Sequence, residues 1–202
     1  MPKIINYDNQ KEIIAEAAWR IIKREGIGNA SVRNIAKEAG ISSGALQHYF
    51  SSQSQLLEFA MNMVVERVEG RFTLIGNEIS SITLENAKKI LWNLMPVNEE
   101  QELEMEVWLS LTVKAQHEPS LNKISKSTNE SMYLIILTLL KQLEEAGLLK
   151  KGLELSMEAK RLHILLDGLS LHRMVSPDTM TNDVLHAVLN RHLTDLAEGL
   201  SD

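Results

Sequence analysis

The stretch "VRNIAKEAGISSGALQHYF", residues 32–50, decides the fold. Its first half has helical apolar spacing, with Ile35 and Ala36 on one face. Ala36 is small enough for a second helix to cross close against it. Gly40 then permits the left-handed backbone that redirects the chain. A short helix, a tight turn and a second short helix together predict a helix-turn-helix unit.

The second half of the stretch predicts a helix that is too short to be stable alone. Leu46 and Phe50 point back toward the core of the first helix and would hold it there. Its outer face keeps the polar side chains Ser43, Gln47 and His48, with Tyr49 at the edge. Glutamine can bond adenine with both amide atoms, and serine can contact several base edges. This chemistry suits a DNA groove, although the same spacing would also fit a helical hairpin whose polar face is only solvated.

The rest of the chain has helical spacing almost throughout. A serine with a glutamine three residues later, Ser52 and Gln55, predicts the start of a long helix. Pro96 and Pro119 mark later boundaries. No segment shows sustained strand alternation, so we expect an all-α fold with about nine helices and no sheet.

Composition and charge set limits on function. The 202 residues are 44% hydrophobic and contain no cysteine, which excludes disulfides, thiolate metal sites and cysteine nucleophiles. The first residues lack the apolar core of a signal peptide and no apolar run is long enough to cross a bilayer, so we expect a cytoplasmic protein with no membrane partner. Residues 1–50 carry seven basic and five acidic side chains, a net charge of +2, whereas the whole chain carries −6. A mildly basic head on an acidic body is compatible with a nucleic-acid-binding head.

The segment "GIGNASVRNIAKEAGISSGALQHYFSSQSQLLEFA", residues 26–60, closely resembles the N-terminal domain of the TetR family of bacterial transcriptional regulators. The resemblance implies an N-terminal three-helix helix-turn-helix domain, residues 1–52, and a ligand-sensing and dimerisation domain, residues 53–202. It also implies a homodimeric repressor that leaves a palindromic DNA operator when it binds a small-molecule effector. The DNA contacts that we expect are Arg33, Ser42, Ser43, Ala45, Gln47, His48 and Tyr49.

Two positions depart from the family. Tyrosine is usual where Gln47 stands, so the base preference at this position is expected to be unusual. Lysine is usual where Gln53 stands, at the start of the fourth helix, and is expected to touch a phosphate. Its loss should weaken DNA binding and reduce the salt dependence of binding.

The body resembles the C-terminal domain of a TetR subgroup typified by the choline-responsive repressor of the betaine pathway. The similar pieces are "EVWLSLTVKAQHEPSL" and "LLDGLSLHRMVSPDTMTNDVLHAVLNRHLTDL". The resemblance implies a dimer built from the last two helices as a four-helix bundle. The leucine stripes there predict an interface of Leu162, Leu166, Leu169, Leu185, Leu189 and Leu193, although such stripes could also pack internally.

Aromatic residues and methionines of the middle helices could line an adaptable apolar pocket for the effector. The candidates are Phe72, Trp92, Met95, Met105, Trp108, Leu109, Thr112, Met132 and Tyr133. Each could equally belong to the core, and the sequence does not identify the effector.

Two other function classes compete with this interpretation. A helical-bundle enzyme or metal carrier would need Glu-x-x-His pairs, and none of the six histidines has a glutamate three residues before it. No phosphate-cradling glycine loop or nucleophile elbow is present either, so we expect no catalytic residue, metal or cofactor. A sensor that has lost DNA binding and acts through protein partners is the other alternative, and the missing lysine favours it weakly.

Overall fold

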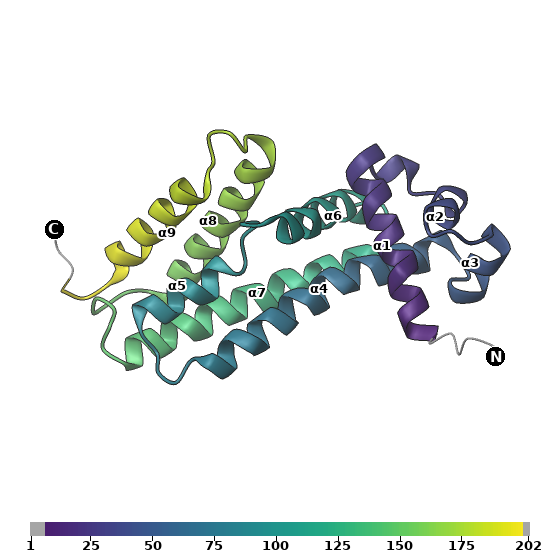
Figure 1. The fold of residues 1–202 in the computed structure, drawn as a ribbon. Helices are drawn as coiled ribbons and strands as arrows, with labels where there is room; N and C mark the ends of the chain where they lie inside the picture. The colour runs from purple at the N-terminus through teal and green to yellow at the C-terminus, as the bar shows by residue number, and fades with distance from the viewer. Residues whose placement is uncertain (1–6, 200–202) are drawn as a thin grey trace. The chain divides into compact units, whose positions relative to one another are not determined.

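The computed structural model describes residues 7–199, and this part of the chain consists of α-helices (Figure 1). The α-helices are α1 Tyr7–Glu25, α2 Val32–Glu38, α3 Ser43–Tyr49, α4 Gln53–Glu78, α5 Leu84–Trp92, α6 Glu99–Ala115, α7 Pro119–Glu145, α8 Leu155–Val175 and α9 Asn182–Leu196. One turn of 3-10 helix, Ile27–Asn29, follows α1. The described residues contain no strand, and the expected all-α fold with about nine helices is confirmed.

The described residues divide into two compact units. Unit 1 runs to Arg67 and includes Leu103–Ser127, whereas unit 2 comprises Val68–Glu102 and the chain from Thr128 onward. Helices α4, α6 and α7 therefore contribute to both units. The compact unit that contains α1, α2 and α3 thus extends past residue 52, so the functional boundary expected there remains a prediction.

Unit 1 has its core around α1. Trp19 is buried, and its indole Nε1 donates a hydrogen bond to the Ala60 carbonyl at 3.0 Å. The Arg67 guanidinium lies 4.6 Å from the centre of the Trp19 ring and pairs with the Glu16 carboxylate at 2.6 Å. These contacts fix α4 against α1, and buried Leu111 of α6 belongs to the same core. The residues buried in the helix-turn-helix segment therefore share a core with α1, α4 and α6.

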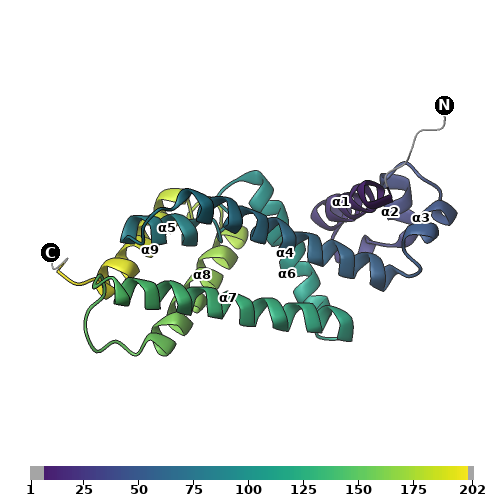
Figure 2. The ribbon, with the colours of Figure 1, turned by 90° about the horizontal axis from the view of Figure 1, so that it is seen from below.

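Unit 2 packs α5, α8 and α9 with the second part of α7 around a leucine-rich core (Figure 2). Arg173 of α8 connects α6 and the loop before α9. The Arg173 guanidinium pairs with Glu102 at 2.8 Å and also donates to the Met180 carbonyl at 2.9 Å. Beyond the helices, Leu149 and Ala197 form an isolated antiparallel bridge, which anchors the end of α9 to the loop after α7.

Two features are absent from the described residues. No helix in residues 7–199 is long and apolar enough to span a membrane. Within the same residues, no group of three or more His, Cys, Asp or Glu side chains is placed to hold a metal ion.

Candidate nucleic-acid interface

Helices α2 and α3 form the expected helix-turn-helix. Ser31 caps α2 by accepting a hydrogen bond from the Asn34 amide at 3.3 Å. At the other end, the Gly40 amide bonds the Lys37 carbonyl at 3.2 Å and the Ile41 amide bonds the Ala36 carbonyl at 2.9 Å. This pair of bonds is a Schellman motif, which needs the left-handed backbone that Gly40 supplies with φ of 70°.

Helix α3 is held by the two apolar residues that the sequence indicated. Leu46 is fully buried and Phe50 is 4% exposed, and both join the core of unit 1 with Ile35 and Ala36. A seven-residue helix would not persist by itself, so this burial is what keeps α3 folded. Because Leu46 fills the core, truncating it to alanine is expected to cost about 2–5 kcal/mol.

The polar face of α3 is exposed as predicted for a recognition helix. Ser43, Gln47 and His48 are exposed, whereas Ala45 and Tyr49 are half-buried. Ser42 is the cap of α3, since its hydroxyl oxygen accepts from the Ala45 amide at 3.1 Å. Its hydroxyl hydrogen can still donate to a ligand.

Helix α1 positions the end of α3 through a contact that sequence reasoning missed. The Tyr7 hydroxyl donates to the backbone carbonyl of His48 at 3.0 Å, and its ring lies 5.0 Å from the ring of Tyr49. The ammonium of Lys11 lies 4.9 Å from the centre of the Tyr7 ring. Neither residue lies in a motif, so only their place one helix before the hairpin could have suggested the contact.

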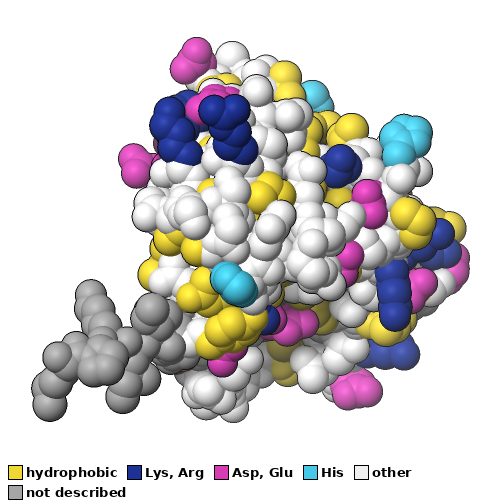
Figure 3. All heavy atoms as spheres, turned by 90° about the vertical axis from the view of Figure 1, so that its right-hand side faces the viewer, with side chains coloured by type: hydrophobic (Ala, Val, Ile, Leu, Met, Phe, Trp, Pro, Cys, Tyr) yellow, Lys and Arg dark blue, Asp and Glu magenta, His cyan; other side chains and the backbone are white. Residues whose placement is uncertain are grey.

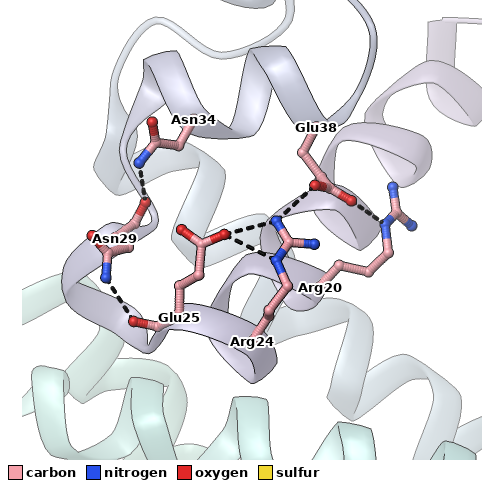
Figure 4. Close-up of polar contacts among 6 residues, drawn as sticks. All are labelled: Arg20, Arg24, Glu25, Asn29, Asn34 and Glu38. Carbon is pink, nitrogen blue, oxygen red and sulfur yellow. Dashed lines mark hydrogen bonds and ion pairs between the residues drawn. The ribbon is translucent and has the colours of Figure 1, made fainter.

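Several basic side chains of unit 1 are neutralised by ion pairs (Figure 4). Glu38 of α2 accepts from Arg20 and Arg24, each at 2.9 Å, and Arg24 also pairs with Glu25 at 2.8 Å. The hydrogen bonds from Arg24 and Arg20 lower the pKa of the Glu38 carboxyl, and the bonds to Glu38 and Glu25 raise the pKa of Arg24. The face of the molecule drawn in Figure 3 carries Lys and Arg side chains interspersed with Asp and Glu.

Two further basic residues of unit 1 belong to α2. Arg33 and Lys37 are exposed and line a hollow of about 470 Å³ at the junction of α2 and α3. The other lining residues are Asn34, Ala36, Ile41, Ser42 and Ser43. The hollow is therefore lined both by the basic side chains of α2 and by Ser42 and Ser43, two predicted DNA contacts at the start of α3.

The residues predicted for an effector pocket are distributed over both units. Met105, Trp108, Leu109 and Thr112 belong to unit 1, where Trp108 packs on the core and the Thr112 hydroxyl is buried with no hydrogen-bond partner among the described residues. In unit 2, Met95 is fully buried, and Met132 and Tyr133 pack against the core. The Trp92 ring meets the His186 ring edge-on at 5.3 Å.

Unit 2 has a groove of about 330 Å³ between α4, α5 and α7, which the sequence did not indicate. Of the nine predicted pocket residues, only Phe72 lines it. The other lining residues are Gly76, Ile90, Leu134, Ile135, Thr138, Leu139 and Gln142.

The six leucines predicted for the dimer interface lie in the core of unit 2. Leu162, Leu166, Leu169, Leu185, Leu189 and Leu193 are all 6% exposed or less within a single chain. They pack against α5 and α7 and so are not surface residues. The apolar residues that α8 does expose are Met157, Ile164, Leu171 and Val175.

Two protein families match separate segments of the chain, and curated relatives match nearly all of it. Residues 14–60 match the family described as bacterial regulatory proteins of the tetR family, and residues 84–198 match the C-terminal domain of BetI-type transcriptional repressors. The HTH-type transcriptional regulator PksA of Bacillus subtilis is 40% identical over 97% of this chain and 94% of its own length. The regulator BetI of Proteus mirabilis is 26% identical over 88% of this chain and 86% of its own length.

Solved structures show the same fold. A transcriptional regulator from Rhodococcus sp. RHA1 superposes with a TM-score of 0.81 at 26% identity, covering 93% of this chain and 97% of its own. A regulator from Saccharomonospora viridis, crystallised in complex with choline, superposes with a TM-score of 0.87 at 22% identity, covering 95% of this chain and 99% of its own. These relatives are transcriptional regulators and not enzymes. The chain therefore belongs to the TetR family of bacterial regulatory proteins and is a DNA-binding transcriptional regulator.

Proposed function

We propose that the protein is a homodimeric repressor of the bacterial cytoplasm that binds a palindromic operator and leaves it when a small molecule binds unit 2. The observation that carries the proposal is the exposed polar face of α3 on a helix anchored by Leu46 and Phe50. A helix fixed in this way can enter the major groove without losing its own packing.

The DNA contacts follow from the chemistry of the exposed side chains. Gln47 is suited to pair with an adenine through both atoms of its amide, and Ser43 to contact a neighbouring base edge. Arg33, at the start of α2, is suited to a phosphate or an adjacent guanine. His48 and Tyr49 would add hydrogen bonds to the backbone, and Ala45 leaves room for close approach.

A dimer is supported by the exposed face of α8. Met157, Ile164 and Leu171 recur every seven residues and Val175 follows four residues later, so all four lie along one stripe. Ile164 is 71% exposed and Val175 is 70% exposed in the single chain. A stripe of this kind matches its own copy across a two-fold axis, and two-fold symmetry also fits a palindromic operator.

The groove of unit 2 supports an effector site. Its lining contains no charged side chain, and only Thr138 and Gln142 offer hydrogen bonds. These features favour an uncharged, mainly apolar effector. A quaternary ammonium such as choline, which the Saccharomonospora viridis protein holds, would be better served by several aromatic rings or a carboxylate, and this groove has only the ring of Phe72.

Selection of genomic fragments with the purified protein tests the proposal. Fragments that share a two-fold symmetric site should be enriched, and the half-sites should lie about one DNA turn or a multiple of it apart. Enrichment of no common sequence would contradict the repressor function and favour a sensor that acts through protein partners.

A further inference from the structure

We propose that the hollow between α2 and α3 binds one phosphate of the DNA backbone, with Lys37 as its main cationic partner. The inference rests on the proposed operator binding and adds a residue that the sequence did not indicate. Lys37 is exposed and lines the hollow together with Arg33, Ser42 and Ser43.

The hollow has the donors that a phosphate diester needs. A lysine ammonium supplies a point charge with three N–H donors, and an arginine can bond two phosphate oxygens at once. The Ser43 side chain is exposed. The Ser42 oxygen already accepts the Ala45 amide, so the hydroxyl hydrogen remains to be donated. Four side chains that line the hollow, from α2, the cap of α3 and the first residue of α3, therefore carry hydrogen-bond donors.

The nearest acidic residue on α2 does not cancel this charge. Glu38 follows Lys37 directly in the chain, but its carboxylate is bound by Arg20 and Arg24 on the side of α1 (Figure 4). Those two arginines are thereby used in ion pairs. The positive charge of Lys37 and Arg33 is left to act on a ligand in the hollow.

Two other candidate phosphate ligands, on the helices that flank the α2–α3 hairpin, are less suited. Lys11 has its ammonium over the ring of Tyr7, where part of its charge is already engaged. Gln53, at the first position of α4, carries no charge, and its amide donates to the Ala30 carbonyl at 2.6 Å. Lys37 and Arg33 are therefore the cations of α2 and α3 best placed to neutralise the backbone.

A phosphate rather than a base is the expected partner because Lys37 lies in the last turn of α2. The first helix of a helix-turn-helix crosses the backbone, whereas the second enters the groove. A contact of this kind changes the affinity for all DNA sequences by a similar factor, because it reads no base.

Salt titration of DNA binding by Lys37→Gln tests the inference. With an operator fragment from the genomic selection, the dimer loses one phosphate contact in each half-site, so affinity should fall about 60-fold near 0.1 M salt and the slope of log K against log salt should become shallower by about 1.8. Lys37→Arg should retain the slope. Lys23→Gln removes the same charge from an exposed position on α1, outside the hollow, and should behave like the parent.

Duplexes with single methylphosphonates distinguish a backbone phosphate from a free anion. One neutralised position in each half-site should weaken binding by the parent and cause a smaller loss in Lys37→Gln, which has already lost the ammonium contact. If Lys37→Gln binds the operator with the parent's affinity and salt slope, the inference is wrong while the proposed function stands. If inorganic phosphate, at constant ionic strength, displaces operator from the parent but Lys37→Gln leaves the slope unchanged, the hollow is a free-anion site. If the parent selects no DNA, both proposals fail.

Discussion

The side-chain amide of Gln53 donates a hydrogen bond to the backbone carbonyl of Ala30, with the nitrogen and oxygen 2.6 Å apart. The bond joins the first residue of α4 to the residue that precedes the cap of α2. At this position the family usually has a lysine that is expected to touch a phosphate. The side chain here makes an internal contact instead, which gives a physical reason to expect weaker backbone binding than in relatives with lysine.

Gln53→Lys should restore such a contact. We expect operator affinity to increase and the slope of log K against log salt to become steeper by about 1.8, because the dimer gains one phosphate contact in each half-site. The lost hydrogen bond to Ala30 should lower the free energy of unfolding by about 1 kcal/mol. Fluorescence anisotropy at several salt concentrations measures the affinity and its salt slope, and a urea titration measures the free energy of unfolding. Asn62→Lys adds the same charge at an exposed position later in α4, and an equal gain in this control would contradict the local explanation.

The proposed dimer predicts the effect of a charge on the exposed stripe of α8. Ile164→Glu should convert the dimer to monomer at micromolar concentration, since a buried unpaired carboxylate opposes association. Analytical ultracentrifugation measures the mass, and circular dichroism checks that the helices remain. Val113→Glu is a matched control, because Val113 is 66% exposed on α6 and lies outside the stripe. A dimer that survives Ile164→Glu would place the interface elsewhere.

The groove of unit 2 predicts a steric test at Gly76. A Cβ at this position would meet no atom within 4 Å, so Gly76→Leu can fill the groove without distorting α4. N-phenyl-1-naphthylamine, an uncharged apolar fluorophore, should bind the parent saturably and bind Gly76→Leu at least tenfold more weakly. Gly70→Leu introduces the same side chain into equally open space on the same helix, outside the groove. Equal binding of the fluorophore by all three proteins would exclude the groove as an effector site.

The helix-turn-helix could be predicted from sequence because each of its parts has a local signature. Ser31 caps α2 and Gly40 turns the chain within a few residues of their partners, and Leu46 joins the core of Ile35 and Ala36 about ten residues earlier. The contact of Tyr7 with His48 could not be predicted in this way, because it joins residues 41 positions apart with no shared motif.

The body was less predictable because α8 is apolar on two sides. Leu162 and Leu166 face the core, whereas Ile164 and Leu171 are exposed. Apolar spacing identifies both stripes but does not say which one faces inward, since this depends on where α5 and α7 lie. The groove presents the same difficulty, because its walls come from three helices that are distant in sequence.

The most direct test of the account is the affinity of Gln47→Ala and Arg33→Ala for the operator found by genomic selection. Each substitution removes one contact from each half-site, at about 1–3 kcal/mol per contact, and should raise the Kd of the dimer by about 30-fold or more; Gln47→Ala should also tolerate more bases at one position of each half-site. Gln116→Ala, an exposed glutamine at the end of α6, should bind like the parent. If both variants of the α2–α3 hairpin bind the operator as tightly and as selectively as the parent does, α3 is not the recognition helix.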